Sequence, residues 1–191
     1  PEALIGKPLW AVDVKELAED LKAQQPQLKR VRVIRRLPNT LQIDVLERRP
    51  VAQVRLGQWH LVDAEGFILP HASSAPQESV MILKGVETMS APLKVGRANS
   101  SERLRLALRV MERLRRSAAL LGHRVSAVDV SDSHQVKFVM DDEVEIRCGD
   151  EEELATHLER LRTVLRTIAR NPVDIRYIDV RFSDPVVGPR T

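Results

Sequence analysis

The apolar positions near the start of the chain first repeat with helical spacing. Leu17 and Leu21 lie four residues apart and therefore share one face of a helix. Asp13 is a favourable N-cap, and Glu16 three residues later completes a capping box. Pro26 cannot continue a helix. The pattern thus predicts a helix between Asp13 and Pro26.

The spacing then changes to the alternation of a half-buried strand, with valines between arginines in residues 28–34. Pro38 and Asn39 supply turn chemistry, because proline fixes φ and asparagine tolerates the left-handed conformation. A returning strand follows, and Pro50 ends the hairpin. The inward face of that returning strand is expected to carry Leu41, Ile43 and Val45.

Short strands separated by Gly-containing turns follow Pro50. The pattern predicts strands at residues 51–56, 59–62, 67–70 and 80–83. Their spacing is typical of an antiparallel sheet. Residues 71–79 are rich in Ser, Ala and Pro and are expected to form a loop.

Two longer segments carry apolar residues at helical spacing. The first is expected to begin at Ser100 or Ser101 and to end at Gly122, a residue type favoured after helix C-termini. The second is expected to begin at Asp150, with an acidic first turn, and to end before Pro172. The strands predicted around it are residues 125–130, 136–140, 143–147 and 175–182, with turns at Asp132-Ser133 and Asp141-Asp142.

Together these elements predict an α+β fold in two parts. Residues 1–50 form a small helix–strand–strand domain, and residues 51–191 form a mostly antiparallel β domain with two helices. A content of 43% hydrophobic and 30% charged residues is ordinary for a globular chain of this length. No apolar run approaches the roughly 20 residues of a membrane helix. The chain opens at Pro1 without an initiator Met, which is compatible with an anchor upstream of the given sequence.

Positive charge is concentrated in residues 1–56, which hold 11 Lys/Arg against 7 Asp/Glu. A solvated Arg-rich surface accounts for this balance. The alternative is a basic face that meets phosphates, anionic lipid or an acidic partner, formed by Arg30, Arg32, Arg35 and Arg36. No aromatic residues interleave with these arginines, so nucleic-acid binding is not expected.

The sequence shows no catalytic motif: it has no Gly-rich phosphate loop, no nucleophile elbow and no histidine pair at helical spacing. A single cysteine, Cys148, excludes an internal disulfide and a Cys-rich metal site. The histidines are scattered, which is typical of surface residues: His60, His71, His123, His134 and His157. We therefore expect no enzymatic activity, no metal and no cofactor.

Five stretches carry a family resemblance. Two lie in the hairpin region: Arg36-Leu37-Pro38-Asn39-Thr40-Leu41-Gln42-Ile43 and Glu47-Arg48-Arg49-Pro50-Val51-Ala52. The others are Gly6-Lys7-Pro8-Leu9-Trp10-Ala11-Val12-Asp13, Leu61-Val62-Asp63-Ala64-Glu65-Gly66 and Ile178-Asp179-Val180-Arg181-Phe182. In this order they resemble the FtsQ/DivIB family of bacterial cell-division proteins.

The resemblance implies a POTRA domain over residues 1–50, truncated before its first strand, and an FtsQ-type β domain over 51–191. It also implies a single-pass inner-membrane protein, anchored upstream of Pro1, with this region on the periplasmic or extracytoplasmic side at the septum. Such a protein is a non-enzymatic scaffold that binds FtsB (DivIC in Gram-positive bacteria) and FtsL, contacts other divisome proteins through the POTRA domain, and helps control septal peptidoglycan synthesis.

In the family, FtsB adds a strand beside the C-terminal strand of the β domain, helped by the preceding helix. By position, this implies a partner-binding edge formed by Arg181, Phe182, Ser183, Asp184, Val186, Val187 and Gly188, with Phe182 as the aromatic anchor. Pro185 lacks a backbone donor and interrupts this edge. The alternative function is a POTRA-type polypeptide-binding module of a transport or outer-membrane assembly system.

Overall fold

The computed structural model describes residues 8–88, 92–140, 143–171 and 174–190, so the turn predicted at Asp141-Asp142 lies outside the described residues. The chain divides into two compact units, Pro1–Arg49 and Pro50–Thr191. Both units combine helix with sheet. The fold class is therefore α+β, which confirms the prediction from the sequence pattern.

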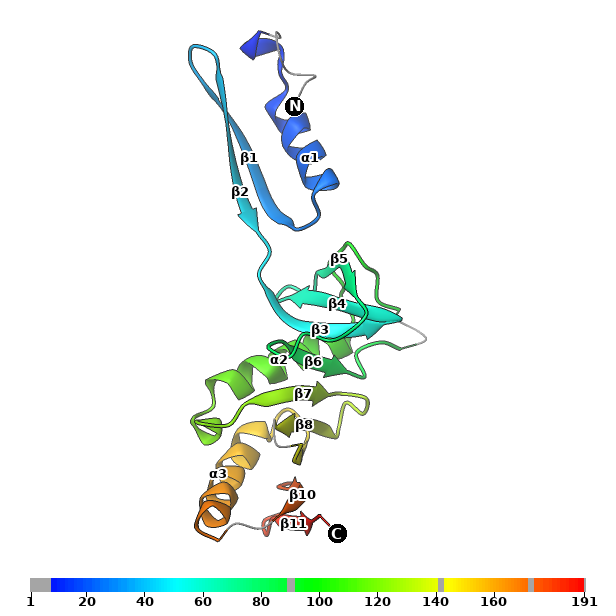
Figure 1. Cartoon of the computed structure of the whole chain (residues 1–191), viewed down its shortest axis with the longest axis vertical. Helices are drawn as coiled ribbons and strands as arrows, with labels where there is room; N and C mark the ends of the chain where they lie inside the picture. Colours follow the sequence, from blue (N-terminus) through cyan, green and yellow to red (C-terminus); the bar gives the residue numbers. More distant parts are fainter. Residues whose placement is uncertain (1–7, 89–91, 141–142, 172–173, 191) are drawn as a thin grey trace. The chain divides into compact units, whose positions relative to one another are not determined.

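The first unit is a helix lying along a β-hairpin (Figure 1). Its elements are the 3-10 helix η2 (Leu9–Ala11), α1 (Val14–Gln24), β1 (Leu28–Arg36) and β2 (Thr40–Glu47). Asp13 caps α1 as predicted, since its carboxylate accepts hydrogen bonds from the backbone N–H groups of Lys15 at 2.8 Å and Glu16 at 3.2 Å. β1 and β2 pair antiparallel, and the Leu37–Pro38 peptide bond between them is cis.

Ile43 and Val45 of β2 lie opposite Val33 and Val31 of β1, so they share the face of the buried Val33 as predicted, but they are not covered: Ile43 is 46% exposed and Val45 is 54% exposed. The reason is that α1 packs against β1, where Val33 is buried, and one helix is too narrow to cover both strands. Arg35 also connects β1 to the segment before α1, because its guanidinium donates a hydrogen bond to the carbonyl of Val12 at 2.7 Å.

The second unit is built on a nine-stranded sheet in the order β11-β10-β9-β8-β7-β6-β3-β4-β5 (Figure 1). Its strands are β3 (Pro50–Leu56), β4 (Gln58–Asp63), β5 (Ile68–Ser73), β6 (Met81–Lys84), β7 (Val125–Asp129), β8 (Val136–Met140), β9 (Glu145–Gly149), β10 (Ile175–Asp179) and β11 (Val186–Pro189). Its helices are α2 (Glu102–Arg116), the 3-10 helix η3 (Ala118–Leu120) and α3 (Leu154–Arg170).

Most strand pairs are antiparallel, as predicted, but the pairs β3–β6, β6–β7 and β9–β10 are parallel. Parallel neighbours need a crossover connection, and α2 and α3 supply two of these crossovers. α2 packs against β7, and α3 packs against β9 and η3.

The core of the second unit contains a row of buried residues that crosses the sheet from strand to strand. Paired positions place Leu83, Val128, Phe138, Ile146 and Ile178 side by side. Each of these side chains is almost fully buried. These buried residues lie on five neighbouring strands, from β6 to β10.

Several local predictions need correction. α2 ends at Arg116 and not at Gly122, because Ser117 adopts an extended conformation before η3. α3 begins at Leu154 and not at Asp150, whose carboxylate lies 2.8 Å from His134 Nδ1 instead of capping the helix.

The surface prediction is wrong for His60 and His157, which are both buried. His60 Nδ1 lies 3.1 Å from the carbonyl oxygen of Leu69. His157 lies on the face of α3 that also carries the buried Leu154, Leu158 and Leu161.

Candidate partner-binding edge

The end of the chain forms the outer strand of the second unit. β11 pairs antiparallel with β10, and among the described strands β10 is its only neighbour. The strand predicted over 175–182 is therefore too long: β10 ends at Asp179, and residues 181–184 bend the chain back. The open edge of the sheet at this end belongs to β11.

The buried row of the core continues onto β11 and stops there. Val187 lies directly opposite Ile178, the last member of the row on β10. Unlike Ile178, Val187 is 38% exposed, because no described strand covers its outer side. The apolar row is thus open at one end.

A groove of about 380 Å³ lies beside Val187, between α3 and the end of the chain. Its lining combines apolar and hydroxyl side chains, so it suits a partly apolar occupant. The lining residues are Arg160, Thr163, Val164, Thr167 and Ile168 of α3, with Ser183, Pro185 and Val187.

An ion pair holds the turn between β10 and β11. The guanidinium of Arg181 donates two hydrogen bonds to the carboxylate of Asp179, Nη2 to Oδ2 at 2.6 Å and Nε to Oδ1 at 2.9 Å. These hydrogen bonds lower the pKa of the Asp179 carboxyl below its usual value. Arg181 also donates to Gln135 at 3.2 Å, and Arg160 of α3 donates to the carbonyl of Val180 at 3.2 Å. The turn is therefore tied both to the strand before it and to the helix.

The ring of Tyr177 on β10 covers Gly188, its partner on β11. A side chain at Gly188 would place its Cβ 2.1 Å from Cε1 of the Tyr177 ring, so only glycine fits beneath this ring. On β9, the guanidinium of Arg147 lies 4.2 Å from the centre of the same ring and donates to Glu145 at 2.7 Å. Glycine at this position lets β11 approach β10 under an aromatic cover.

The residues implied by the family resemblance divide into three groups. Phe182, Val186 and Val187 expose apolar surface, with Phe182 57% exposed. Ser183 and Asp184 are exposed in the turn. Arg181 is engaged by Asp179, and Gly188 is buried, so these two shape the edge from within.

Sequence reasoning missed Tyr177, Arg160 and Gln135. The alternation of residues 175–179 does place Tyr177 and Asp179 on one face, which is a usable signal for the aromatic cover. No sequence signal pairs Gln135 with Arg181, because they lie 46 positions apart and meet only through strand pairing.

Residues 51–181 match the family described as cell division protein FtsQ/DivIB, C-terminal, and residues 2–48 match the POTRA domain, FtsQ-type. The chain is 24% identical over 183 residues to cell division protein FtsQ of Geotalea daltonii, covering 95% of this chain and 65% of that protein. It is 29% identical over 163 residues to cell division protein FtsQ of Myxococcus fulvus, covering 85% of this chain and 56% of that protein. The chain therefore spans less than two thirds of the length of these relatives. Among the described residues, no helix is long and apolar enough to cross a bilayer.

Proposed function

Since the chain belongs to the FtsQ/DivIB family of bacterial cell-division proteins, we propose that it is a divisome scaffold that binds a partner strand at β11. The proposed partners are FtsB or DivIC and FtsL-type proteins. Bound there, the scaffold helps to control septal peptidoglycan synthesis. The family is non-enzymatic, so the function rests on protein–protein contact.

The observation that carries this proposal is the open end of the buried row at Val187. An added strand would satisfy the outer backbone groups of β11 and place an apolar side chain next to Val187. The groove along α3 offers room for that side chain. Main-chain hydrogen bonds would supply affinity, while the groove and the exposed Phe182 ring would supply specificity.

The test is binding of a synthetic peptide from the extracytoplasmic part of an FtsB-type protein, measured by calorimetry. Val187→Asp places a charge at the open end of the row and is expected to weaken binding by about 2–4 kcal/mol. Phe182→Ala removes an exposed aromatic anchor and is expected to cost about 1–2 kcal/mol.

The matched control is His71→Asp, which places the same charge on β5, at the opposite edge of the same sheet. This variant is expected to bind the peptide as tightly as the parent chain. If Val187→Asp also binds with unchanged affinity, or if both aspartate variants weaken binding equally, the edge assignment is refuted.

We further propose that the first unit contacts other divisome proteins and that an anchor upstream of Pro1 holds both units outside the inner membrane. Exposed apolar side chains support a contact surface on the first unit: Trp10, Leu37, Ile43, Val45 and Leu46. Fusing the full-length protein to a reporter that is active only in the periplasm tests the location, and activity is expected. Activity seen only with a reporter that works in the cytoplasm would contradict the proposal.

A further inference from the structure

Two strongly exposed apolar side chains lie at the same end of the first unit. Leu37 is 87% exposed and Trp10 is 83% exposed. Leu37 follows β1 directly, at the tip of the hairpin, and Trp10 belongs to η2 (Figure 1). Arg35 joins the two segments, because its guanidinium donates to the backbone carbonyls of Leu9 at 3.2 Å and Val12 at 2.7 Å. We call the surface formed by Trp10 and Leu37 the apolar tip.

Positive charge accompanies the apolar tip. Arg35 and Arg36 are the last two residues of β1, and in the described part of the chain their side chains bond to neutral groups. The Arg36 guanidinium donates to the amide oxygen of Gln42 at 2.9 Å. The carboxylate of Asp13 lies within electrostatic range of Arg35. The charge that remains without compensation beside Leu37 is therefore that of Arg36.

The other exposed apolar residues of the first unit lie elsewhere on the hairpin. Ile43 and Val45 are on the β2 face that α1 leaves open, and Leu46 pairs with Arg30 near the far end of the two strands. These three residues remain available for the contacts with other divisome proteins proposed above. The apolar tip is a separate surface.

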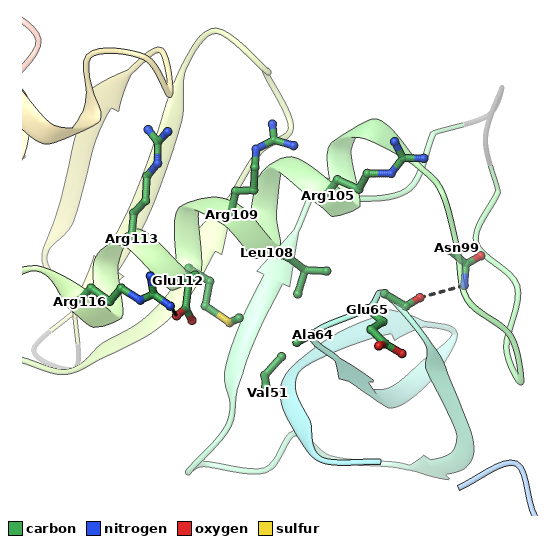
Figure 2. Close-up of a pocket in the computed structure, with 12 residues that line it drawn as sticks. Val51, Ala64, Glu65, Asn99, Arg105, Leu108, Arg109, Glu112, Arg113 and Arg116 are labelled. Carbon is green, nitrogen blue, oxygen red and sulfur yellow. Dashed lines mark hydrogen bonds and ion pairs between the residues drawn. The ribbon is translucent and has the colours of Figure 1, made fainter. Parts of the chain in front are cut away.

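A larger cationic surface on the second unit does not combine charge with apolar groups in this way. Four arginines of α2 line a groove of about 800 Å³: Arg105, Arg109, Arg113 and Arg116. Figure 2 shows the guanidinium groups of the first three on the other side of α2 from Leu108 and Val51. Glutamates bind Arg109 and Arg116, each at 2.7 Å. Only the apolar tip presents an uncompensated arginine next to exposed apolar side chains when these two surfaces are compared.

This composition suits the interface of a lipid bilayer. Tryptophan favours the boundary between the headgroups and the hydrocarbon, since its ring is apolar and its N–H is polar. Leucine gains free energy by entering the acyl region, and arginine is attracted to anionic headgroups. The location proposed above keeps the first unit close to the inner membrane, so a bilayer is the surface that the tip meets at high local concentration.

We propose that the apolar tip docks on an anionic phospholipid bilayer. Trp10 lies at the headgroup boundary, Leu37 enters the acyl region, and Arg36 binds lipid phosphate groups. This inference rests on the membrane location proposed above and not on the partner strand at β11. Docking holds the first unit against the membrane surface.

Trp10 itself reports docking through its fluorescence. The chain has two tryptophans, so Trp59→Phe leaves Trp10 as the single reporter. Vesicles of phosphatidylglycerol and phosphatidylethanolamine are expected to shift the Trp10 emission to shorter wavelength, and phosphatidylcholine vesicles are expected to shift it much less. Lipids with brominated acyl chains are expected to quench the Trp10 emission.

Cosedimentation with the same vesicles measures the affinity. Leu37→Ser is expected to weaken binding by roughly tenfold, because it removes the side chain that enters the acyl region. Arg36→Glu is expected to weaken binding by roughly fivefold or more, because it reverses the charge beside the headgroups. Both residues are exposed, so the thermal transition should stay that of the parent chain.

Matched controls change the same residue types on the second unit. Leu121→Ser replaces a leucine that is 80% exposed, and Arg105→Glu reverses the charge of an exposed arginine on α2. Both variants are expected to bind within about twofold of the parent chain, because attraction to anionic headgroups falls off within a Debye length.

The proposal is overturned if the anionic vesicles leave the Trp10 emission unchanged, or if Leu121→Ser weakens binding as much as Leu37→Ser. It is also overturned if an oligoglutamate peptide shifts the Trp10 emission and the vesicles do not, since the tip would then bind an acidic protein segment. The reporter fusion tests the location separately. A correctly located protein whose tip does not dock would contradict this inference alone.

Discussion

Gly188 offers the sharpest test of how the C-terminal edge is held. In Gly188→Ala, the new Cβ would lie 2.1 Å from Cε1 and 2.5 Å from Cζ of Tyr177, well inside van der Waals contact. The ring is bounded on the side of β9 by the Arg147 guanidinium at 4.2 Å. The Tyr177 ring therefore has to change rotamer, or β11 has to move away from β10.

The expected cost follows from these contacts. Overpacking of one methyl group typically costs about 1–3 kcal/mol. A displaced ring also gives up its contact with Arg147, worth about 0.5–1 kcal/mol at a partly exposed site. Because β11 is the outermost strand, most of this cost should appear as local opening of β11 and less as global unfolding.

Amide hydrogen exchange at Val186–Gly188 measures that opening directly. Gly188→Ala is expected to speed exchange there by roughly 5- to 150-fold, which corresponds to about 1–3 kcal/mol. The Phe138 amide in the sheet interior should exchange as before.

Tyr177→Ser is the matched rescue, because it removes the ring that the new methyl group meets. Gly188→Ala in a Tyr177→Ser background should therefore cost much less than in the parent chain. Unchanged exchange at β11 in Gly188→Ala, or an equal cost in both backgrounds, would refute the role assigned to this pair.

Three further predictions concern the interior of the second unit. Asp179→Asn removes a carboxylate that accepts two hydrogen bonds from Arg181 and is expected to lower the free energy of unfolding by about 1–3 kcal/mol at neutral pH. Because the folded-state pKa of Asp179 lies below its ordinary value of 3.8, the stability from this pair is complete above that pH and is lost as pH falls through the folded pKa. Parent and variant should therefore converge in acid denaturation, and a constant difference down to the lowest pH would contradict the assignment. Gln53→Leu should destabilise the unit by about 1–3 kcal/mol in urea unfolding, since the buried Gln53 amide bonds the backbone of Gln77 and the carbonyl of Val80. Burial raises the pKa of the Cys148 thiol to about 12, so iodoacetamide should label Cys148 at neutral pH only after unfolding, and rapid labelling of the folded chain would disprove its burial.

Elements governed by neighbouring residues were predictable from the sequence. The caps at Asp13 and Ser101 depend on hydrogen bonds to backbone groups two or three residues away, and both are present. The Asp150 cap is absent: α3 begins only at Leu154, and the Asp150 carboxylate lies 2.8 Å from Nδ1 of His134, 16 positions earlier. Local capping patterns hold only where no distant side chain competes for the same oxygen atoms.

In the candidate site, too, some features follow from local sequence and others from contacts between distant residues. The end of the chain could be recognised as the proposed partner edge from short motifs such as Ile178–Phe182. Those motifs indicate that an edge exists but not how it is arranged. The predicted single strand is in fact two strands, β10 and β11, joined by a turn at 181–184 that the Asp179–Arg181 ion pair holds.

The α+β class, most element positions and the family resemblance could be inferred from the sequence alone, because periodicity, caps and turns are short-range properties. That Val187 ends an open apolar row and that Gly188 lies under Tyr177 became visible only in the folded chain. Each of these features depends on which strands and helices become neighbours. Neighbours in a sheet are chosen by burial of the whole core, and no single stretch of the chain carries that information.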